Sequence, residues 1–175
     1  KNELVTAPSL NAMYLRPVVN LFLKYKNHIS NDSDYAPLLM IDIKENGKAV
    51  LDKLVKELSA HRSVFDRSVN PQAMQVVVSG DRGTPSSWAD YSDIILFDGR
   101  PNEVYDSAAL QKCAFISDSY FNYLSPADSI DIRLQKLIQK VHSMKKLLRL
   151  WAIPDNAESW KQLHSNQHRL RTQFF

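Results

Sequence analysis

A parallel α/β fold is the prediction of this sequence, and three features of the chain support it. Short apolar runs recur along the chain, as expected for strands that are buried on both faces of a parallel sheet. Segments with apolar residues at helical spacing separate most of these runs, and alternating strands and helices are typical of a parallel sheet. Polar residues or Gly follow the first four runs, where a strand would give way to a loop.

The first predicted elements are a helix, a strand and a second helix. Residues 10–25 place apolar side chains three and four positions apart, and Pro17 must either kink this helix or begin a second one. Residues 37–44 form an almost continuous apolar run with charge only at its end, which predicts a buried strand. An Asn-Gly pair closes that run, and residues 49–60 again show helical spacing.

The later elements follow the same pattern. Three short apolar runs that end at Ser-Gly, Asp-Gly and Ser-Asp predict strands, and they cover 74–78, 93–97 and 113–116. The segment between the last two carries only weak helical signal. A long helix is predicted over 126–144 and a fifth strand over 147–151. Asp155 or Asn156 would cap a last helix that runs through Leu163.

The composition excludes several classes of protein. Lys and Arg exceed Asp and Glu by 22 to 19, a net charge of +3, and the basic residues are interspersed with acidic ones. We therefore expect no nucleic-acid partner. No apolar run approaches the roughly 20 residues of a membrane span, so no transmembrane segment is predicted. The single cysteine, Cys113, excludes an intrachain disulfide, and its apolar neighbours predict a buried structural thiol.

Either an open doubly wound sheet or a closed barrel would suit the alternating pattern. The chain has four Gly, and no Gly-rich phosphate loop follows any predicted strand, which excludes the dinucleotide fingerprint and the nucleotide P-loop. In both architectures function collects at the carboxyl ends of the strands. The residues there are polar and charged, a pattern that favours an anionic ligand. They are Asp42, Lys44, Ser79, Arg82, Asp98, Arg100, Ser117, Asp118 and Trp151.

Asp42 and Lys44 are the sharpest pair among these residues. Side chains alternate along a strand, so both are expected on the face opposite Ile41 and Ile43. If that face lines a barrel, Asp42 can hold a divalent cation while Lys44 meets a phosphate oxygen bound to the same cation. The alternative is a simple salt bridge at a strand end.

The same alternation places Arg149 and Trp151 on one face of the fifth strand. Trp151 at the strand end would suit the apolar part of an amphiphilic substrate, and the alternative is a core tryptophan packed under a loop. The histidines offer no comparable signal, because none follows a predicted strand. His164 and His168 stand four apart, where a solvated surface pair is predicted rather than a metal site.

Five segments at successive strand ends carry a resemblance to a known family. They are LMIDIK at 39–44, VSGDR at 78–82, FDGRP at 97–101, ISD at 116–118 and RLWAIPDN at 149–156. Together they resemble the phosphatidylinositol-specific phospholipase C-like enzymes of the glycerophosphodiester phosphodiesterase superfamily, over about residues 10–163. Each segment is short, and their order along the chain is what makes the resemblance specific.

The resemblance implies a TIM-type (β/α) barrel that hydrolyses phosphodiester or phospholipid-derived substrates in lipid metabolism, with a divalent cation, Mg²⁺ or Ca²⁺. It implies Asp42 as a metal ligand, Lys44 as the catalytic phosphate contact and Trp151 as a substrate-binding aromatic. An extracytoplasmic location, secreted or periplasmic, is also implied. The remaining substrate-binding positions that the resemblance implies are Ser79, Arg82, Asp98 and Arg100.

The chain departs from this family pattern in two places. Relatives carry catalytic histidines and an acidic pair on their first two strands, and none of these residues precedes Leu10. The last strand of the pattern also has no counterpart. Five strands of eight cannot close a barrel, so residues 1–175 are expected to form part of a single barrel domain. The alternatives are a catalytically inactive barrel that binds a phosphorylated or lipid ligand, and an α/β domain that serves interaction or scaffolding.

Overall fold

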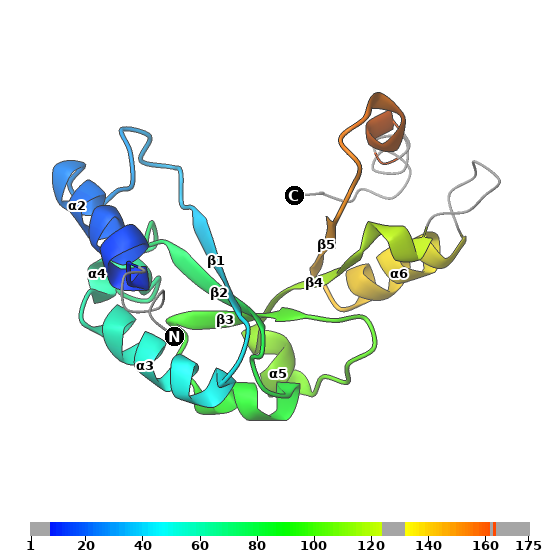
Figure 1. The fold of residues 1–175 in the computed structure, drawn as a ribbon, viewed down its shortest axis with the longest axis horizontal. Helices are drawn as coiled ribbons and strands as arrows, with labels where there is room; N and C mark the ends of the chain where they lie inside the picture. Colours follow the sequence, from blue (N-terminus) through cyan, green and yellow to red (C-terminus); the bar gives the residue numbers. More distant parts are fainter. Residues whose placement is uncertain (1–7, 124–131, 162, 164–175) are drawn as a thin grey trace. The chain divides into compact units, whose positions relative to one another are not determined.

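A five-stranded parallel sheet organises the chain and confirms the predicted α/β class (Figure 1). The computed structural model describes residues 8–123, 132–161 and 163. The order of the strands in the sheet is their order in the sequence, and all five predicted strands are present. The strands are β1 Leu38–Ile43, β2 Gln75–Gly80, β3 Ile95–Gly99, β4 Cys113–Ser119 and β5 Leu147–Trp151.

Three strands extend further toward their carboxyl ends than predicted. β2 includes Ser79 and Gly80, and β3 begins at Ile95 but continues through Gly99. β4 runs on to Ser119. Several of the polar residues at the strand ends are therefore part of the ladder, so strand geometry decides which face each one occupies.

Contacts within the chain divide it into two compact units. Unit 1 comprises residues 1–83 and 90–96, and unit 2 comprises residues 84–89 and 97–175. β1 and β2 belong to unit 1, and β4 and β5 belong to unit 2. That residues 1–175 form one barrel domain stays a prediction.

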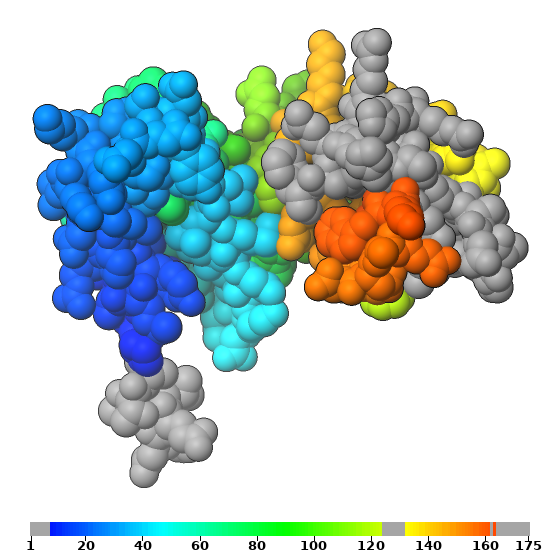
Figure 2. Space-filling view, turned by 90° about the horizontal axis from the view of Figure 1, so that it is seen from above, coloured from blue at the N-terminus to red at the C-terminus, as the bar shows by residue number. Residues whose placement is uncertain are grey.

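The helices of unit 1 begin with a π-helical turn that runs directly into an α-helix. Pro17 lies in the first turn of that α-helix, a position that tolerates proline. The segment predicted over 10–25 is thus one helical stretch whose α-helical part begins beside Pro17, and Figure 2 shows its dark blue start next to the cyan α3. The helices are η1 Asn11–Leu15, α2 Arg16–Lys24, α3 Gly47–Ser59 and α4 Arg62–Phe65, the last of which was not predicted.

The core of unit 1 lies between α3 and the sheet. Leu51, Leu54 and Leu58 recur along one face of α3, and none is more than 3% exposed. The strand residues 76–78 of β2 are fully buried valines. This periodic apolar face is what predicted the helix over 49–60, and its burial is what holds α3 on the sheet.

Unit 2 contains two helices that are capped by side chains. The Asp106 carboxylate accepts a hydrogen bond from the Ala109 amide at 2.8 Å and begins α5, which the weak helical signal had left undefined. Asn156 caps the predicted last helix by accepting from the Ser159 amide at 2.9 Å. The first residues of the helix predicted over 126–144 lie outside the described ranges. Besides the helix that Asn156 caps, the helical elements of this unit are η2 Pro85–Asp90, α5 Ser107–Lys112, η3 Tyr120–Tyr123 and α6 Ile132–Ser143.

No helix in the described ranges has both the length and the apolar character of a membrane span. The described helices are instead amphipathic, and α6, for example, buries one apolar stripe and exposes Lys136 and Lys140.

Trp88 anchors the core of unit 2, and nothing in the sequence singled it out. Its side chain is fully buried in η2. The indole stacks on the Phe97 ring with 4.7 Å between centroids and 7° between planes, and the Tyr105 ring lies tilted at 5.9 Å. Aromatic stacking of this geometry adds to the burial of apolar area, so this cluster is a main source of stability in the unit.

Cys113 is buried, as predicted. Its side chain is 1% exposed, and the thiol donates a hydrogen bond to the Phe115 carbonyl at 3.3 Å. Burial raises the pKa of the Cys113 thiol to about 11, although the nearby Lys146 ammonium favours the thiolate. The sulfur is therefore a protonated thiol at neutral pH, which suits a structural residue rather than a nucleophile.

We expect Cys113 to resist alkylation in the native protein. At pH 8 the thiolate fraction of a thiol with a pKa of about 11 is lower, by a factor of about a hundred or more, than that of a thiol with the ordinary pKa near 8.5. Reaction with a chromogenic disulfide reagent should be at least that much slower in the native protein than in concentrated guanidinium. Native labelling as fast as that of the unfolded chain would contradict the burial of Cys113.

Candidate functional site

Asp42 and Lys44 lie together at the end of β1. Ile41 lines the same pocket as Val50 and Leu54 of α3, so it marks the helix-covered face of the strand. Asp42 occupies the opposite face, where Ser79 of β2 is its register partner. The Lys44 ammonium contacts the Asp42 carboxylate at 2.5 Å, so the two side chains share a direction as predicted.

This ion pair is open to solvent. The Lys44 side chain is 82% exposed and that of Asp42 is 49% exposed. Exposed ion pairs contribute little to stability, with a typical value of about 0–1 kcal/mol. An anionic ligand can therefore replace the carboxylate as the partner of Lys44 at little cost. The same geometry is what a simple salt bridge at a strand end would show.

Gly80 allows the end of β2 to pass close to Asp42. Its φ is +76°, a left-handed conformation that favours glycine. A Cβ atom at this position would collide with the Ile43 carbonyl oxygen and with the Asp42 carboxylate. In the sequence, the Ser-Gly pair marked only the end of the predicted strand and gave Gly80 no role at the site.

Asp81 holds the start of α3 against the end of β2. Its amide donates to the Ile43 carbonyl at 2.7 Å, and its carboxylate accepts from the Gly47 amide at 2.8 Å. A carboxylate at a helix N-terminus satisfies an amide that has no partner within the helix. Asp81 is therefore occupied in positioning α3 rather than open to a ligand.

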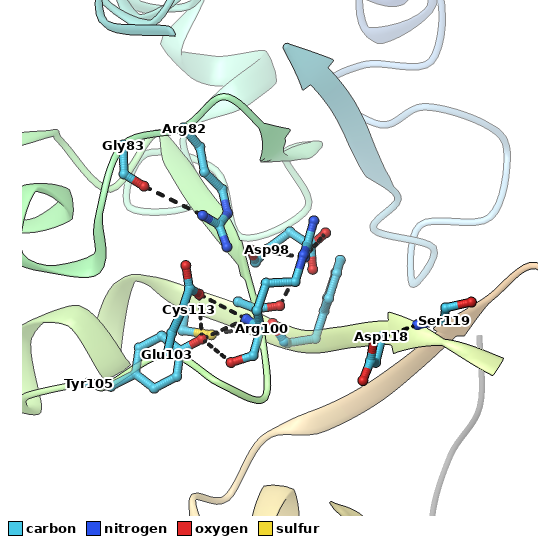
Figure 3. Close-up of polar contacts among 11 residues, drawn as sticks. Arg82, Gly83, Asp98, Arg100, Glu103, Tyr105, Cys113, Asp118 and Ser119 are labelled. Carbon is cyan, nitrogen blue, oxygen red and sulfur yellow. Dashed lines mark hydrogen bonds and ion pairs between the residues drawn. The ribbon is translucent and has the colours of Figure 1, made fainter. Parts of the chain in front are cut away.

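The two other predicted residues of unit 1 are largely shielded from solvent. Ser79 is 8% exposed on the Asp42 face, and Arg82 is 6% exposed. Arg82 donates to the Gly83 carbonyl at 3.4 Å (Figure 3). Ser79 therefore lies beside the Asp42–Lys44 pair, while the Arg82 side chain presents little surface of its own.

Asp98 and Arg100 at the end of β3 are paired with each other. The Arg100 guanidinium lies 2.7 Å from the Asp98 carboxylate, which belongs to a residue only 1% exposed. The same guanidinium donates to the carbonyls of Asp98 and Gly99 at 3.3 and 2.9 Å (Figure 3). A buried charged pair with these added hydrogen bonds is difficult to separate, so a ligand would meet Arg100 in this fixed position.

The loop that follows β3 is held by the Tyr105 hydroxyl. The hydroxyl accepts from the Arg100 amide at 2.7 Å, and contacts the Arg100 carbonyl and the Glu103 carboxylate at 2.9 and 2.8 Å. Burial, and then the hydrogen bond to Glu103, raise the pKa of Tyr105 well above its ordinary value. Tyr105 thus stays a neutral hydrogen-bonding group that orders the backbone around Arg100.

Trp151 and Arg149 share a face of β5, as predicted. Their register partners on β4 are Ser119 and Ser117, which also share a face. Trp151 is 45% exposed at the strand end, so it is not a core tryptophan. Asp118 lies on the other face, where it accepts from the Asn122 amide at 2.8 Å and contacts the Tyr123 hydroxyl.

The described residues do not by themselves fit a divalent cation. No group of three or more His, Cys, Asp and Glu side chains gathers anywhere in the described part of the chain. At the end of β1, Asp42 offers one open carboxylate, while Asp81 is bound to α3. Mg²⁺ and Ca²⁺ take six or more oxygen ligands. The cation therefore remains an implication of the resemblance, with Asp42 as the residue that would contact it.

The described histidines lie away from the strand ends. His61 precedes α4, His142 is in the last turn of α6, and His28 lies in the connector before β1. The Nδ1 atom of His28 is buried without a hydrogen-bond partner among the described residues. His164 and His168 lie outside the described ranges. None of the described histidines is placed to transfer a proton at the end of a strand.

Comparison with family models, with curated proteins and with solved structures found no match to this chain. The residues at the strand ends therefore carry the functional argument on their own.

Proposed function

We propose that this chain is a phosphodiester hydrolase of the glycerophosphodiesterase and phospholipase C-like type, and that the end of β1 receives the phosphoryl group. The observation that carries the proposal is the exposed Asp42–Lys44 pair on the strand face opposite α3, beside Ser79. By resemblance, the enzyme would work with Mg²⁺ or Ca²⁺. A TIM-type barrel, of which residues 1–175 would form part, and the extracytoplasmic location belong to the same proposal.

Lys44 is the residue that would bind the phosphoryl oxygen. An ammonium on an exposed side chain donates up to three hydrogen bonds, and charge-assisted bonds to phosphate are stronger than neutral ones. Asp42 keeps Lys44 at the strand end until a ligand arrives, since the two groups are 2.5 Å apart. The nearby Ser79 hydroxyl lies on the same face and adds a polar group beside the phosphoryl position.

A second candidate function is binding of a phosphorylated or lipid ligand without hydrolysis. The position of the described histidines favours it, because none of His28, His61 and His142 lies at a strand end. General acid–base catalysis needs a proton-transfer group within hydrogen-bonding reach of the reacting atoms. The two candidates share the phosphate contact at Lys44 and differ in turnover.

The test is hydrolysis of bis(p-nitrophenyl) phosphate by the full-length protein in Mg²⁺ or Ca²⁺, with and without EDTA. We expect EDTA to stop the reaction and Lys44→Ala to lower kcat/KM by about a hundredfold, the usual size of a lost charged contact to a reacting phosphate. Lys48→Ala is the matched control, because Lys48 is 81% exposed and also paired with a carboxylate, that of Asp52.

The outcomes separate the candidates. Turnover that persists in EDTA would contradict the cation, and equal activity of the Lys44→Ala and Lys48→Ala variants would contradict the phosphate contact. Absence of turnover, with binding of the diester that is lost only in Lys44→Ala, would favour the second candidate.

A further inference from the structure

A polar side chain on β4 is buried without a partner. Ser117 is 0% exposed, and among the described residues its hydroxyl makes no hydrogen bond. Buried hydroxyl groups are almost always hydrogen-bonded, because losing water without a replacement costs free energy. A ligand that accepts or donates a hydrogen bond at this hydroxyl would explain the exception.

The neighbour of Ser117 on β5 is a cation that has no counterion among the described residues. Arg149 is its register partner, so both side chains project from the same face of the sheet. Arg149 is half-buried and forms no ion pair or hydrogen bond within the described residues. Partial burial removes part of the water that would otherwise stabilise its charge. Three other basic residues of unit 2 have partners: Arg100 with Asp98, Lys140 with the Pro101 carbonyl, and Lys146 with the Cys113 carbonyl.

Trp151 and Ser119 form the next pair on this face, at the carboxyl ends of β4 and β5. Trp151 is 45% exposed, so part of its indole is available for contact. The opposite face of these strands buries Ile116, Leu148 and Leu150, none of which is more than 3% exposed, and carries the half-buried Asp118 toward the end of β4. On the face of Ser117, the exposed part of Trp151 and the half-buried Arg149 are the groups that a ligand would meet.

We propose that Arg149 and Ser117 bind the phosphoryl group of a phosphate ester whose ring lies on Trp151. The planar guanidinium donates two parallel hydrogen bonds to phosphoryl oxygens, and a serine hydroxyl donates a third. An aromatic or sugar ring next to the phosphate then packs on the indole. The resemblance gives Trp151 a place near substrate but assigns nothing to Arg149 or Ser117. This site does not depend on hydrolysis at β1.

The test is a titration of the ¹⁵N-labelled full-length protein with three probes. Phenyl phosphate carries the anion and the ring, inorganic phosphate carries only the anion, and phenol carries only the ring. The readouts are the indole N–H signal of Trp151, assigned with Trp151→Phe, and the side-chain Nε–H signal of Arg149. We expect saturable shifts of both signals with phenyl phosphate, weaker binding of phosphate and no saturation with phenol.

Three variants separate the contacts. Arg149→Gln should weaken binding of both phosphate probes by about tenfold or more, as expected for a lost charge-assisted fork. Ser117→Ala should weaken it by about threefold and should not lower Tm, because it removes an unsatisfied hydroxyl. Trp151→Ala should abolish the advantage of phenyl phosphate over phosphate. Lys136→Gln, an equal charge change at an exposed position of α6, is the control and should alter no dissociation constant.

Equal effects of Arg149→Gln and Lys136→Gln would overturn the proposal, as would phenol binding as tightly as phenyl phosphate. A lower Tm of Ser117→Ala would show that its hydroxyl is satisfied in the free protein, and would overturn it too. If the protein does not hydrolyse the diester, the signals of Trp151 and Arg149 should still shift with phenyl phosphate. If those signals do not shift, Lys44→Ala should still lower hydrolysis. The two proposals can therefore fail separately.

Discussion

Trp88→Ala is expected to lower the free energy of unfolding by about 3–5 kcal/mol, the usual cost of removing a large buried aromatic side chain. The indole is fully buried, and its stacking on Phe97 and tilted contact with Tyr105 would be lost together. Since most domains are stable by about 5–15 kcal/mol, this one change removes a large share of the total.

The measurement is urea denaturation followed by far-ultraviolet circular dichroism, which does not depend on the indole removed. Trp160→Ala makes the same chemical change at a position that is 50% exposed, and it should cost no more than about 1 kcal/mol. Trp88→Phe should retain most of the stability, because a ring remains to stack on Phe97. Equal losses for Trp88→Ala and Trp160→Ala would mean that η2 is not part of the core.

The contrast between β1 and η2 shows what the sequence could predict of the fold. β1 is an almost continuous apolar run, which correctly predicted a strand, but the prediction that this strand is buried was wrong. β1 is the first strand in the sheet order, Leu38 is 47% exposed, and Ile43 is the one residue of the strand that is buried. η2 begins within the stretch Thr84 to Ser87, which has no large apolar residue, and its one large apolar residue, Trp88, has no periodic neighbours. The burial of Trp88 depends on Phe97 and Tyr105, which come from other elements, so no local pattern could reveal it.

The site divides in the same way. That Asp42 lies with Lys44, and Arg149 with Trp151, follows from alternation along one strand, which is a property of the backbone. By contrast, the pairing of Asp98 with Arg100 depends on how the chain turns after β3. These contacts join residues through loop geometry, for which a single sequence carries little signal.

A second consequence of loop geometry concerns Asp81 and Gly80. Asp81 caps α3 across a separation of many residues, a contact that decides whether its carboxylate can serve a ligand. Nothing in the sequence predicted a special role for Gly80, because a glycine after a strand is common in turns. Only the close approach of the Asp42 carboxylate to the place where a Cβ atom would lie shows that this position tolerates no side chain. That approach links the fold to the placement of a proposed functional residue.

Gly80→Ala is the second change for which we expect a large effect, a loss of about 2–4 kcal/mol in the free energy of unfolding. Alanine is disfavoured at φ +76° by about 1–2 kcal/mol. In addition, its Cβ would collide with the Ile43 carbonyl, which is backbone, and with the Asp42 carboxylate. The end of β1 must therefore shift, and urea denaturation of Gly80→Ala measures the cost.

Combining Gly80→Ala with Asp42→Ala tests whether the carboxylate contributes to that cost. Because Asp42→Ala removes one of the two colliding groups, Gly80→Ala should cost about 1 kcal/mol less in that background than in the wild type, a coupling of the size seen between neighbouring residues. The backbone penalty and the collision with the Ile43 carbonyl remain in both. An identical cost of Gly80→Ala in the two backgrounds would mean that the Asp42 carboxylate does not lie over Gly80. In that case Asp42 would not be held beside Ser79 at the end of β1, where the proposed phosphoryl contact requires it.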